Sequence, residues 1–455
     1  MKSLTKHFSR RTGITMVLSM KFLVLLSTLA ISVTTMSDTN AQSAVNHKKG
    51  NAAFYNAESG MQVIRYWLKG ISLPDSSSAR LADFLGELDS TLSANCISNI
   101  TLDTGGNVAA VPLSCSGSDS FSAQILDHPT DPNLIRVSIT GQHDNITRTI
   151  QTDFKIYSVK SKIFDFCLAT KGPVLFCGNP TIEGINSNNE ADMYIESLNN
   201  TTALTVTGNT NFDGDINVVN SNGDVQFDGD INIAGDNGST AIDEHVSIGT
   251  EEIEFPVPDT DHFRQYLNGS TIDSSTDLSK GMTLTNTLIE AGTNPCFDGN
   301  VIIKGVLFIE SPNQVVFNGN VDTRGIIIGD GDPEDTCGNE MIFNGNFESG
   351  PVPDEFEFDN MTAETGSTLV APGFKATMAG NFASVGGTIA VSGIKISGNA
   401  NAVVKGSIIN YSDETTIIEG NATLRFDQSA NIKTPAGFLS PAILKYEPST
   451  WTMTH

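Results

Sequence analysis

A short unit that reads apolar–polar–Gly–Asn or Asp recurs along the C-terminal half of the chain, from about residue 200 onward. Where nothing interrupts them, successive copies begin roughly 20 residues apart. Repeats of about this period are typical of solenoids, in which each unit buries its apolar side only against its neighbours. The copies are VTGNT (206–210), FDGDI (212–216), FDGDI (227–231), FDGNV (297–301), FNGNV (317–321), FNGNF (343–347), MAGNF (378–382), ISGNA (396–400) and IEGNA (418–422).

Each repeat has the residue types that a tight corner and a buried strand require. Glycine followed by Asn or Asp permits a positive φ at the corner. An apolar residue precedes the corner, and short β-branched strands follow it, as in VIIKGVLFI (301–309) and RGIIIGDG (324–331). Stacked units of this kind form parallel sheets around one apolar core. We therefore expect a parallel β-helix over residues 166–440, with a β-sandwich as the alternative.

Residues 251–296 interrupt the repeat. This stretch contains Pro256 and Pro258 together with Phe255, Phe263 and Tyr266. We expect a loop with a short helix that projects from the β-helix. Long insertions on a rigid scaffold are where binding usually occurs, and a capping role is the alternative.

The composition is that of a secreted, β-rich, acidic protein. Charged residues make up only 17% of the chain, and its formal net charge is −26. Between Lys171 and Arg264 there are 17 carboxylates and no basic residue. Proteins that bind nucleic acid carry a basic face, so nucleic-acid binding is excluded as a function class.

The N-terminal residues combine a basic segment with an apolar one. Residues 14–35 form an apolar run that is long enough to cross a bilayer, and MKSLTKHFSRRTG precedes it without an acidic residue. Two interpretations fit this pattern. One is a secretory signal that is cleaved after Ala41. The other is a leader that is cleaved between Gly13 and Ile14, which leaves the apolar run at the start of the mature chain.

An amphipathic pattern follows the apolar run. Phe54, Ala57, Met61, Ile64 and Leu68 recur at steps of three and four residues, which places them on one face of a helix. The pattern ends before Gly70, the position at which a helix commonly terminates. We therefore expect one long helix over residues 14–70, apolar in its first half and amphipathic in its second.

The segment AFYNAESG (53–60) resembles the signature of minor pilins with a PilX-type N-terminal domain, and it lies at the family's distance from RRTG (10–13). The stretch LIRVSITGQHDNITRTIQTDFKIY (134–157) looks like the family's hairpin. The resemblance implies a prepilin-type leader over residues 1–13 and a methylated Ile14 after cleavage at Gly13. The assembly helix would then carry the residues of the signature, which are Phe54, Tyr55, Ala57, Glu58 and Gly60.

Two positions depart from the pattern of major pilins. Leu18 stands where those pilins carry a glutamate at the fifth mature position, and its loss is typical of minor pilins at or near a filament tip. Lys21 lies inside the apolar run, where a lysine costs about 2.5–3.5 kcal/mol on insertion scales. Lys21 also fits a signal peptide whose apolar region begins at Phe22.

The resemblance implies a structural protein of a type IV pilus, active in pilus assembly and surface adhesion. Its partners would be other pilins, the pilus assembly machinery, the prepilin peptidase and a host or surface carbohydrate or protein. It would reside in the bacterial inner membrane as a precursor and later in an extracellular pilus. One alternative is a secreted β-helix protein that binds or cleaves polysaccharide. The other is a membrane-anchored scaffold without a filament.

Residues 71–165 read as a small α+β head. A helical pattern covers Ser78–Leu92, and alternation predicts strands over Ile135–Ile139 and Thr147–Ile156 around a turn at Gly141–Asn145. Residues 441–455 are expected to form a C-terminal tail.

The six cysteines suggest disulfides in an oxidising compartment. No pair forms a C-x-x-C motif and no histidine stands near one, so a zinc site is poorly supported. Neighbours in sequence would pair as Cys96 with Cys115, Cys167 with Cys177, and Cys296 with Cys337.

The sequence gives little support for an enzyme. His245 and His262 are isolated in sequence, and the carboxylates Asp213, Asp215, Asp228 and Asp230 are explained by corner formation. We expect no catalytic residue and no resident cofactor. Calcium is the one candidate ion, because the acidic loop 329–340 offers oxygen ligands, although it lacks EF-hand spacing.

Overall fold

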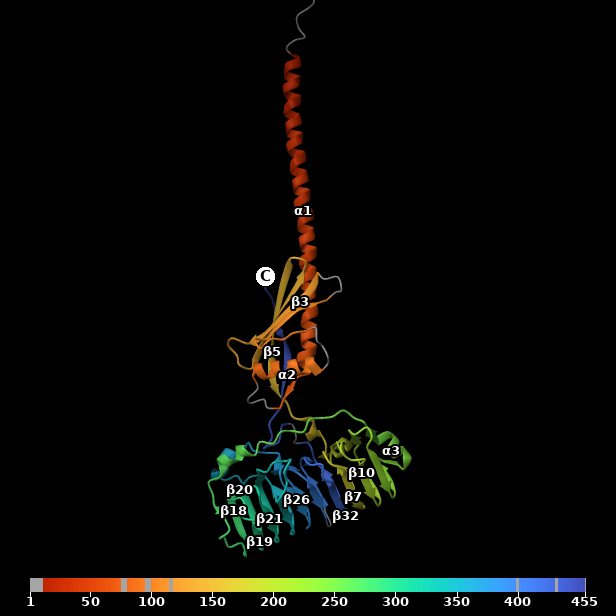
Figure 1. The fold of residues 1–455 in the computed structure, drawn as a ribbon, viewed down its shortest axis with the longest axis vertical. Coiled ribbons are helices and arrows are strands. Elements are labelled where there is room, and N and C mark those ends of the chain that lie inside the picture. The colour runs from red at the N-terminus through yellow and green to blue at the C-terminus, as the bar shows by residue number, and fades with distance from the viewer. Residues whose placement is uncertain are drawn as a thin grey trace, which may run out of the picture. The chain divides into compact units, whose positions relative to one another are not determined.

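The computed structural model describes residues 11–74, 80–94, 100–113, 118–397, 401–429 and 433–454. The chain forms two compact units (Figure 1). Unit 1 comprises Met1–Leu73, Ala79–Tyr157 and Ile443–His455, and unit 2 comprises Pro74–Ser78 and Ser158–Ala442. The fold is mainly β, with a long N-terminal helix and extensive parallel sheets.

Unit 1 combines two helices with an antiparallel sheet. Helix α1 (Arg11–Lys69) is continuous over 59 residues, and α2 (Leu81–Ala94) follows it. The six strands of the sheet lie in the order β1 (Ser72–Leu73), β34 (Ala442–Thr454), β5 (Ile146–Ser158), β4 (Leu134–His143), β3 (Asp119–Asp127) and β2 (Asn107–Pro112).

The predicted hairpin of unit 1 is confirmed, and the predicted tail is wrong. Strands β4 and β5 pair antiparallel from Leu134 opposite Lys155 to His143 opposite Ile146. The helix expected over Ser78–Leu92 is present as α2, shifted by about one turn. Residues 442–454 are a strand of the same sheet and not a free tail, since Leu444 is buried and Tyr446 contacts Phe154.

Unit 2 is built from short strands in three sheets, and almost all of their pairings are parallel. The nine-stranded sheet runs β13 (Asp224–Asp228), β10 (Thr202–Thr207), β7 (Val174–Gly178), β32 (Thr416–Gly420), β29 (Ile394–Ile396), β26 (Lys375–Met378), β23 (Glu340–Phe343), β21 (Gln314–Phe317) and β19 (Cys296–Phe297). The seven-stranded sheet runs β15 (Asp236–Asn237), β14 (Ile231–Ile233), β11 (Thr210–Phe212), β8 (Thr181–Gly184), β33 (Thr423–Phe426), β30 (Asn401–Val404) and β27 (Ser384–Val385).

The third sheet of unit 2 is the largest, and short helices accompany it. Its strands run β16 (Val246–Ile248), β12 (Ile216–Val218), β9 (Met193–Ile195), β6 (Leu168–Thr170), β31 (Ile408–Asn410), β28 (Thr388–Val391), β25 (Ser367–Ala371), β22 (Val321–Gly329), β20 (Val301–Ile309), β18 (Met282–Ile289) and β17 (Thr271–Ile272), with β24 (Phe347–Gly350) also on β22. The helices are η1 (Lys162–Asp165), η2 (Asn188–Ala191), α3 (Ser239–His245), η3 (Asp261–Tyr266) and η4 (Phe356–Met361).

The chain enters these sheets in the middle and not at an end. In the nine-stranded sheet, β7 is the first strand in sequence, yet it pairs with both β10 and the late strand β32 (Figure 1). Thr416 lies opposite Val174, although the two come from opposite ends of the sequence of unit 2. The chain therefore builds outward from β7 to β13, crosses to the opposite end, and builds back from β19 to β32.

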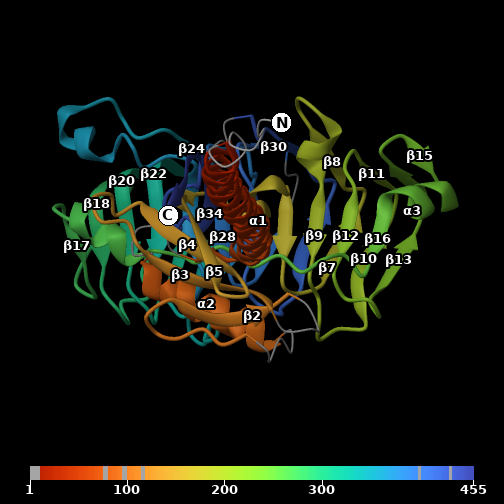
Figure 2. The same cartoon turned by 90° about the horizontal axis from the view of Figure 1, so that it is seen from above.

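The crossing segment corrects the prediction of a projecting insertion at 251–296. Phe255, Phe263 and Tyr266 are buried against Phe308 and Tyr411 on one face of the twelve-stranded sheet. The second part of the predicted insertion supplies β17 and β18 of that sheet (Figure 2). The segment that contains Pro256 and Pro258 is therefore a strap that covers one face of the sheet. Burial of its aromatic rings against that face stabilises the strap.

The Gly–Asn units stack as corners between neighbouring strands. A Cβ on Gly319 would lie 2.3 Å from the carbonyl oxygen of Gly299, and one on Gly345 would lie 2.3 Å from that of Gly319. Asn320 N–H donates to Asn300 Oδ1 at 3.0 Å, and Asn346 N–H donates to Asn320 Oδ1 at 3.0 Å. At Gly319 and Gly345 glycine is required because the backbone of the next corner approaches too closely for a side chain, and not because of a positive φ. Gly208 and Gly229 do have the positive φ that the sequence predicts.

Inside the corners, the apolar residue of each unit forms part of the core of unit 2. The rings of Phe297, Phe317 and Phe343 stack at 4.9 and 5.0 Å between centroids. The first FDGDI unit (212–216) is an exception, because Gly214 packs on Ala191 at a different corner, between β11 and β12. Conversely, Gly178 in FCGN (176–179) stacks with Gly208 and belongs to the repeat, although it was not among the predicted units.

Candidate functional site

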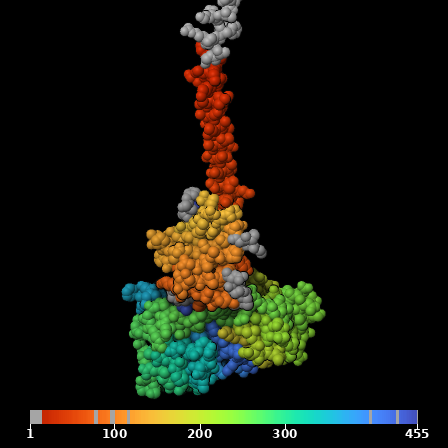
Figure 3. Space-filling model, turned by 45° about the horizontal axis from the view of Figure 1, so that its top comes forward, coloured from red at the N-terminus to blue at the C-terminus, as the bar shows by residue number. Residues whose placement is uncertain are grey.

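The first half of α1 is an apolar surface that nothing in unit 1 covers. Ile14 is 71% exposed, Leu18 54% and Val33 61%, and Figure 3 shows this part of the helix standing clear of the rest of its unit. Within the described residues, Ile14–Lys69 is one helix long and apolar enough to cross a membrane, with a mean hydropathy of 2.1 over its most apolar window. An exposed apolar surface of this extent requires a bilayer or other apolar surfaces around it.

The second half of α1 packs against β3 and β4 through small residues. Ala53 and Ala57 are fully buried, and Gly60 lies against the ring of Phe121, where a Cβ would be 2.5 Å from that ring. From the other side, Gly141 of β4 faces the backbone of α1, and a Cβ there would be 2.2 Å from Ala53 O. The helix and the sheet can approach this closely only because these positions carry Gly or Ala.

Polar contacts fix the rotation of α1 on the sheet. Asn56 Nδ2 donates to Asp119 Oδ1 at 2.9 Å and to the Gln142 carbonyl at 2.7 Å. His143 Nδ1 lies 2.6 Å from Asp119 Oδ1, and the hydrogen bonds from His143 and Asn56 lower the pKa of Asp119. Lys49 Nζ lies 2.9 Å from Asp144 Oδ2.

The residues of the N-terminal signature divide into a buried and an exposed set. Ala57 and Gly60 are buried, and half-buried Phe54 meets Trp451 of β34 edge to face at 6.4 Å. Tyr55 is 63% exposed, and the exposed Glu58 has no bonded partner in the part of the chain that the structure describes. The packing of small residues therefore explains Ala57 and Gly60, and Tyr55 and Glu58 remain available to other molecules.

The structure does not bring the two ends of the predicted assembly helix together. Leu18 and Phe54 lie in different halves of one continuous helix, about 54 Å apart at a rise of about 1.5 Å per residue. The bond between Gly13 and Ile14 lies near the start of α1, whereas Ala41 lies in the interior of the helix.

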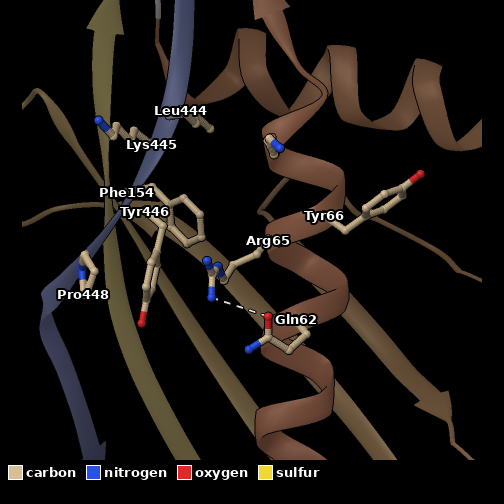
Figure 4. A pocket seen from close by; sticks show the side chains of 9 residues that line it. Gln62, Arg65, Tyr66, Phe154, Leu444, Lys445, Tyr446 and Pro448 are labelled. Atoms are coloured by element: carbon tan, nitrogen blue, oxygen red, sulfur yellow. Dashed lines mark hydrogen bonds between the residues drawn. The ribbon is translucent and has the colours of Figure 1, made fainter.

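A groove of about 640 Å³ lies between α1 and β34 (Figure 4). The guanidinium of Arg65 lies 4.1 Å from the centre of the Tyr446 ring, and Arg65 Nη1 donates to Gln62 Oε1 at 3.4 Å. No carboxylate lines the groove among the described residues, although the chain as a whole is strongly acidic. Tyr66, which is 79% exposed, points away from Arg65 on the other side of the helix.

Sequence reasoning missed the contribution of β34 to this surface. Trp451 and Tyr446 reach α1 only because residues 442–454 pair beside β5, which lies far away in sequence. The alternation of Leu444 and Tyr446 with Lys445 and Glu447 is the one local signal for this strand, and Pro448 interrupts it.

The predicted disulfides are absent from the described residues. Cys167, Cys177, Cys296 and Cys337 are all free thiols, so the pairs within 167–177 and 296–337 are not formed. Cys167 is buried and donates to the Ala191 carbonyl, and burial raises the pKa of its thiol. Cys96 and Cys115 lie outside the described residues.

Most of the acidic residues that the sequence offers as ligands or catalysts bond within the protein. In the described ranges, no three His, Cys, Asp or Glu side chains gather as a metal site would require. In the loop 329–340, Asp330 pairs with Arg264 at 2.6 Å, and Asp332 and Asp335 accept backbone N–H groups of the same loop.

The two isolated histidines also have carboxylate partners. His245 lies 2.8 Å from Asp215 and 3.2 Å from Asp236, and these hydrogen bonds raise its pKa. His262 Nε2 lies 2.8 Å from Glu364 Oε1. In both cases the contact joins two segments of unit 2.

The chain matches no protein-family model, and no curated protein matches it. Among solved structures it is similar to the crystal structure of the competence-associated pilin ComZ from Thermus thermophilus, at 13% sequence identity. The match covers 90% of this chain and 98% of that chain, with a TM-score of 0.23. A TM-score of this size does not establish a shared fold.

Proposed function

We propose that the chain is a minor-pilin-like structural subunit of a type IV pilus or a related filament. The observation that carries this proposal is the division of α1 into two halves. One half is an uncovered apolar rod that begins at Ile14, and the other is fixed on an antiparallel sheet by Ala53, Ala57 and Gly60. A membrane holds such a rod before assembly, and the apolar helices of other pilins cover it afterward.

The position of the leader supports processing at Gly13. Cleavage between Gly13 and Ile14 would remove the basic segment and keep α1 nearly whole. Cleavage after Ala41 would divide a continuous helix and discard the apolar half. The precursor would thus reside in the inner membrane, and the mature chain would reach the cell surface as part of the filament.

The same proposal gives unit 2 a role in adhesion near the filament tip. Its three parallel sheets are consistent with a β-helix whose corners are the Gly–Asn units. Leu18, in place of the glutamate of major pilins, supports a position at or near the tip. The partners would be other pilins, the assembly machinery, the prepilin peptidase and a surface ligand, and function would require neither catalysis nor a resident cofactor.

A fractionation experiment tests the filament role. Cells that express the full chain natively would be sheared, and the filament fraction would be probed for the protein. A Gly13→Asp variant, which removes the pre-cleavage glycine, is expected to stay in the membrane fraction, whereas a Gly86→Ala variant of the exposed α2 glycine is expected to appear with the filaments. Release of the Gly13→Asp variant into the filament fraction, or absence of the native chain from it, would contradict the proposal.

A further inference from the structure

A pocket of about 600 Å³ opens in unit 2 where the chain leaves the sheets between β24 and β25. Pockets that bind small molecules measure about 300–1,000 Å³, so this one has a suitable size. The excursion 351–366 forms one wall, and β22 contributes Arg324, Gly325 and Ile326. Ser384 and Gly386 at β27 and Lys405 after β30 complete the lining.

The walls of the pocket are fixed before any ligand arrives. Phe358 and Met361 of the excursion are fully buried in the apolar cluster on the twelve-stranded sheet. Lys304 Nζ donates to Glu355 Oε1 at 3.0 Å, and Tyr266 O–H donates to Glu364 Oε1 at 2.7 Å. These contacts hold the excursion to β20 through Glu355 and to η3 through Glu364.

Two cations, Arg324 and Lys405, line this pocket together with two carboxylates, Asp354 and Glu364, in a unit where cations are scarce. Unit 2 contains 12 Lys and Arg residues against 40 Asp and Glu residues, a net charge of −28. Asp322 holds Arg324 through Nε at 2.8 Å and Nη2 at 3.1 Å. Arg324 Nη1 lies over Gly350, where a Cβ would be 2.5 Å away, and neither this atom nor Lys405 Nζ has a bonded acceptor within the described ranges.

Hydroxyl groups supply most of the remaining polar lining. Ser349 Oγ and Thr368 Oγ1 lie 2.9 Å apart, and Gly386 N–H donates to Ser349 Oγ at 2.7 Å, so these two are already bonded. For the hydroxyls of Thr365 and Ser384, the described part of the chain provides no partner. The pocket therefore offers free donors and acceptors next to two cationic donors.

We propose that this pocket binds a sugar residue that carries a carboxylate, as in a uronate-containing glycan. The carboxylate would accept from Lys405 Nζ and Arg324 Nη1, because charge-assisted hydrogen bonds are the strongest available. The sugar hydroxyls would bond Thr365, Ser384 and the exposed carboxylate of Asp354. This inference rests on the proposed adhesive role of unit 2 and assigns that role a site and a ligand class.

Calorimetric titration of the full chain in detergent tests the site. The probes are a short oligogalacturonate and a neutral oligosaccharide of the same length. Lys405→Gln removes one cation at an exposed position, and Lys280→Gln is the matched control, because Lys280 is an exposed lysine outside the pocket. We expect the uronate to bind more tightly than the neutral sugar and Lys405→Gln to weaken that binding about tenfold, with no change for Lys280→Gln.

Three results would overturn the assignment. They are no heat of binding with the uronate, equal affinity for the neutral sugar, and equal affinity of the Lys405→Gln and Lys280→Gln variants. A second variant, Gly350→Ala, displaces the Arg324 guanidinium and is expected to weaken uronate binding while thermal unfolding shows an intact fold. None of these results bears on the processing of the N-terminus, so failure of the pocket is distinct from failure of the filament proposal.

Discussion

Gly60 illustrates how a single residue sets the geometry of unit 1. In an isolated helix, replacing Gly by Ala is stabilising by about 0.5–1 kcal/mol, since alanine restricts the unfolded chain. In α1 the new methyl group would enter the ring of Phe121 and lie 2.9 Å from Ile139 Cγ2. The local preference of the helix and the packing of the sheet therefore oppose each other at this position.

We predict that Gly60→Ala destabilises the protein by about 1–3 kcal/mol, the range for overpacked cores. Gly86→Ala in α2 is the control, because nothing lies within 4 Å of its Cβ position, and it is expected to stabilise by about 0.5 kcal/mol. Urea unfolding of the two variants measures both changes. Equal stability changes would contradict the packing of α1 on β3.

Asp192 gives a pH-dependent prediction. Burial raises the pKa of its carboxyl from 3.8 to about 6, and nearby Asp215 adds to the increase. The folded chain thus binds this proton more tightly than the unfolded chain, and stability falls as pH rises from about 4 to about 6. Asp192→Asn keeps an acceptor for the Asp215 N–H at 2.9 Å and should raise the Tm at pH 7 by about 2 °C.

The same substitution should have no stabilising effect below about pH 4, where the native carboxyl is protonated in both states. Thermal unfolding at pH 7 and at pH 3.5 makes the comparison. A gain that persists unchanged at the lower pH would show that ionisation of Asp192 is not its cause.

At the scale of elements, the stacked corners hold neighbouring strands in register. Asn320 accepts from Asn346 N–H while its own N–H donates to Asn300. Asn320→Ala removes the acceptor and should cost about 0.5–1.5 kcal/mol, whereas Asn320→Asp keeps it and should cost less. Asp230 occupies the equivalent place beside Asn209 in the structure. Denaturant unfolding of both variants tests the role of the side-chain acceptor.

The sequence revealed the elements whose signal is local. The hairpin of β4 and β5 could be predicted because its apolar residues alternate over two adjacent runs, and most Gly–Asn corners could be located by their spacing. The first FDGDI unit was misplaced because the same five residues suit two different corners. Strand β34 and the pairing of Thr416 with Val174 depend on residues far apart in the chain, for which a single sequence carries no local signal.

The candidate site was predictable only on α1. The 3–4 spacing identified Phe54, Ala57, Met61, Ile64 and Leu68 as one face of the helix. The last four are buried, whereas Phe54 is half-buried. The partners of that face, among them Gly141 and Trp451, come from distant strands and had no signal in the helix itself. Pairing the cysteines by adjacency also failed for the four described thiols, because Cys167 and Cys177 belong to different parts of the fold.

At the scale of the whole molecule, the two units differ strongly in net charge. Unit 1 contains 14 Lys and Arg residues against 12 Asp and Glu residues, a net charge of +2, whereas unit 2 carries −28. Like charges at this density repel, and salt screens them. Raising ionic strength from about 0.01 M to about 0.15 M should therefore raise the Tm of the transition that reports on unit 2. A decrease in that Tm would show that ion pairs, not repulsion, dominate.

The mature N-terminus tests the central claim most directly. Mass spectrometry of the protein recovered from cells that express it natively would identify its first residue. The account predicts a chain that begins with N-methylated Ile14 and retains the whole apolar half of α1. A chain that begins at Gln42 would lack that half and would contradict the assignment as a pilin-like subunit.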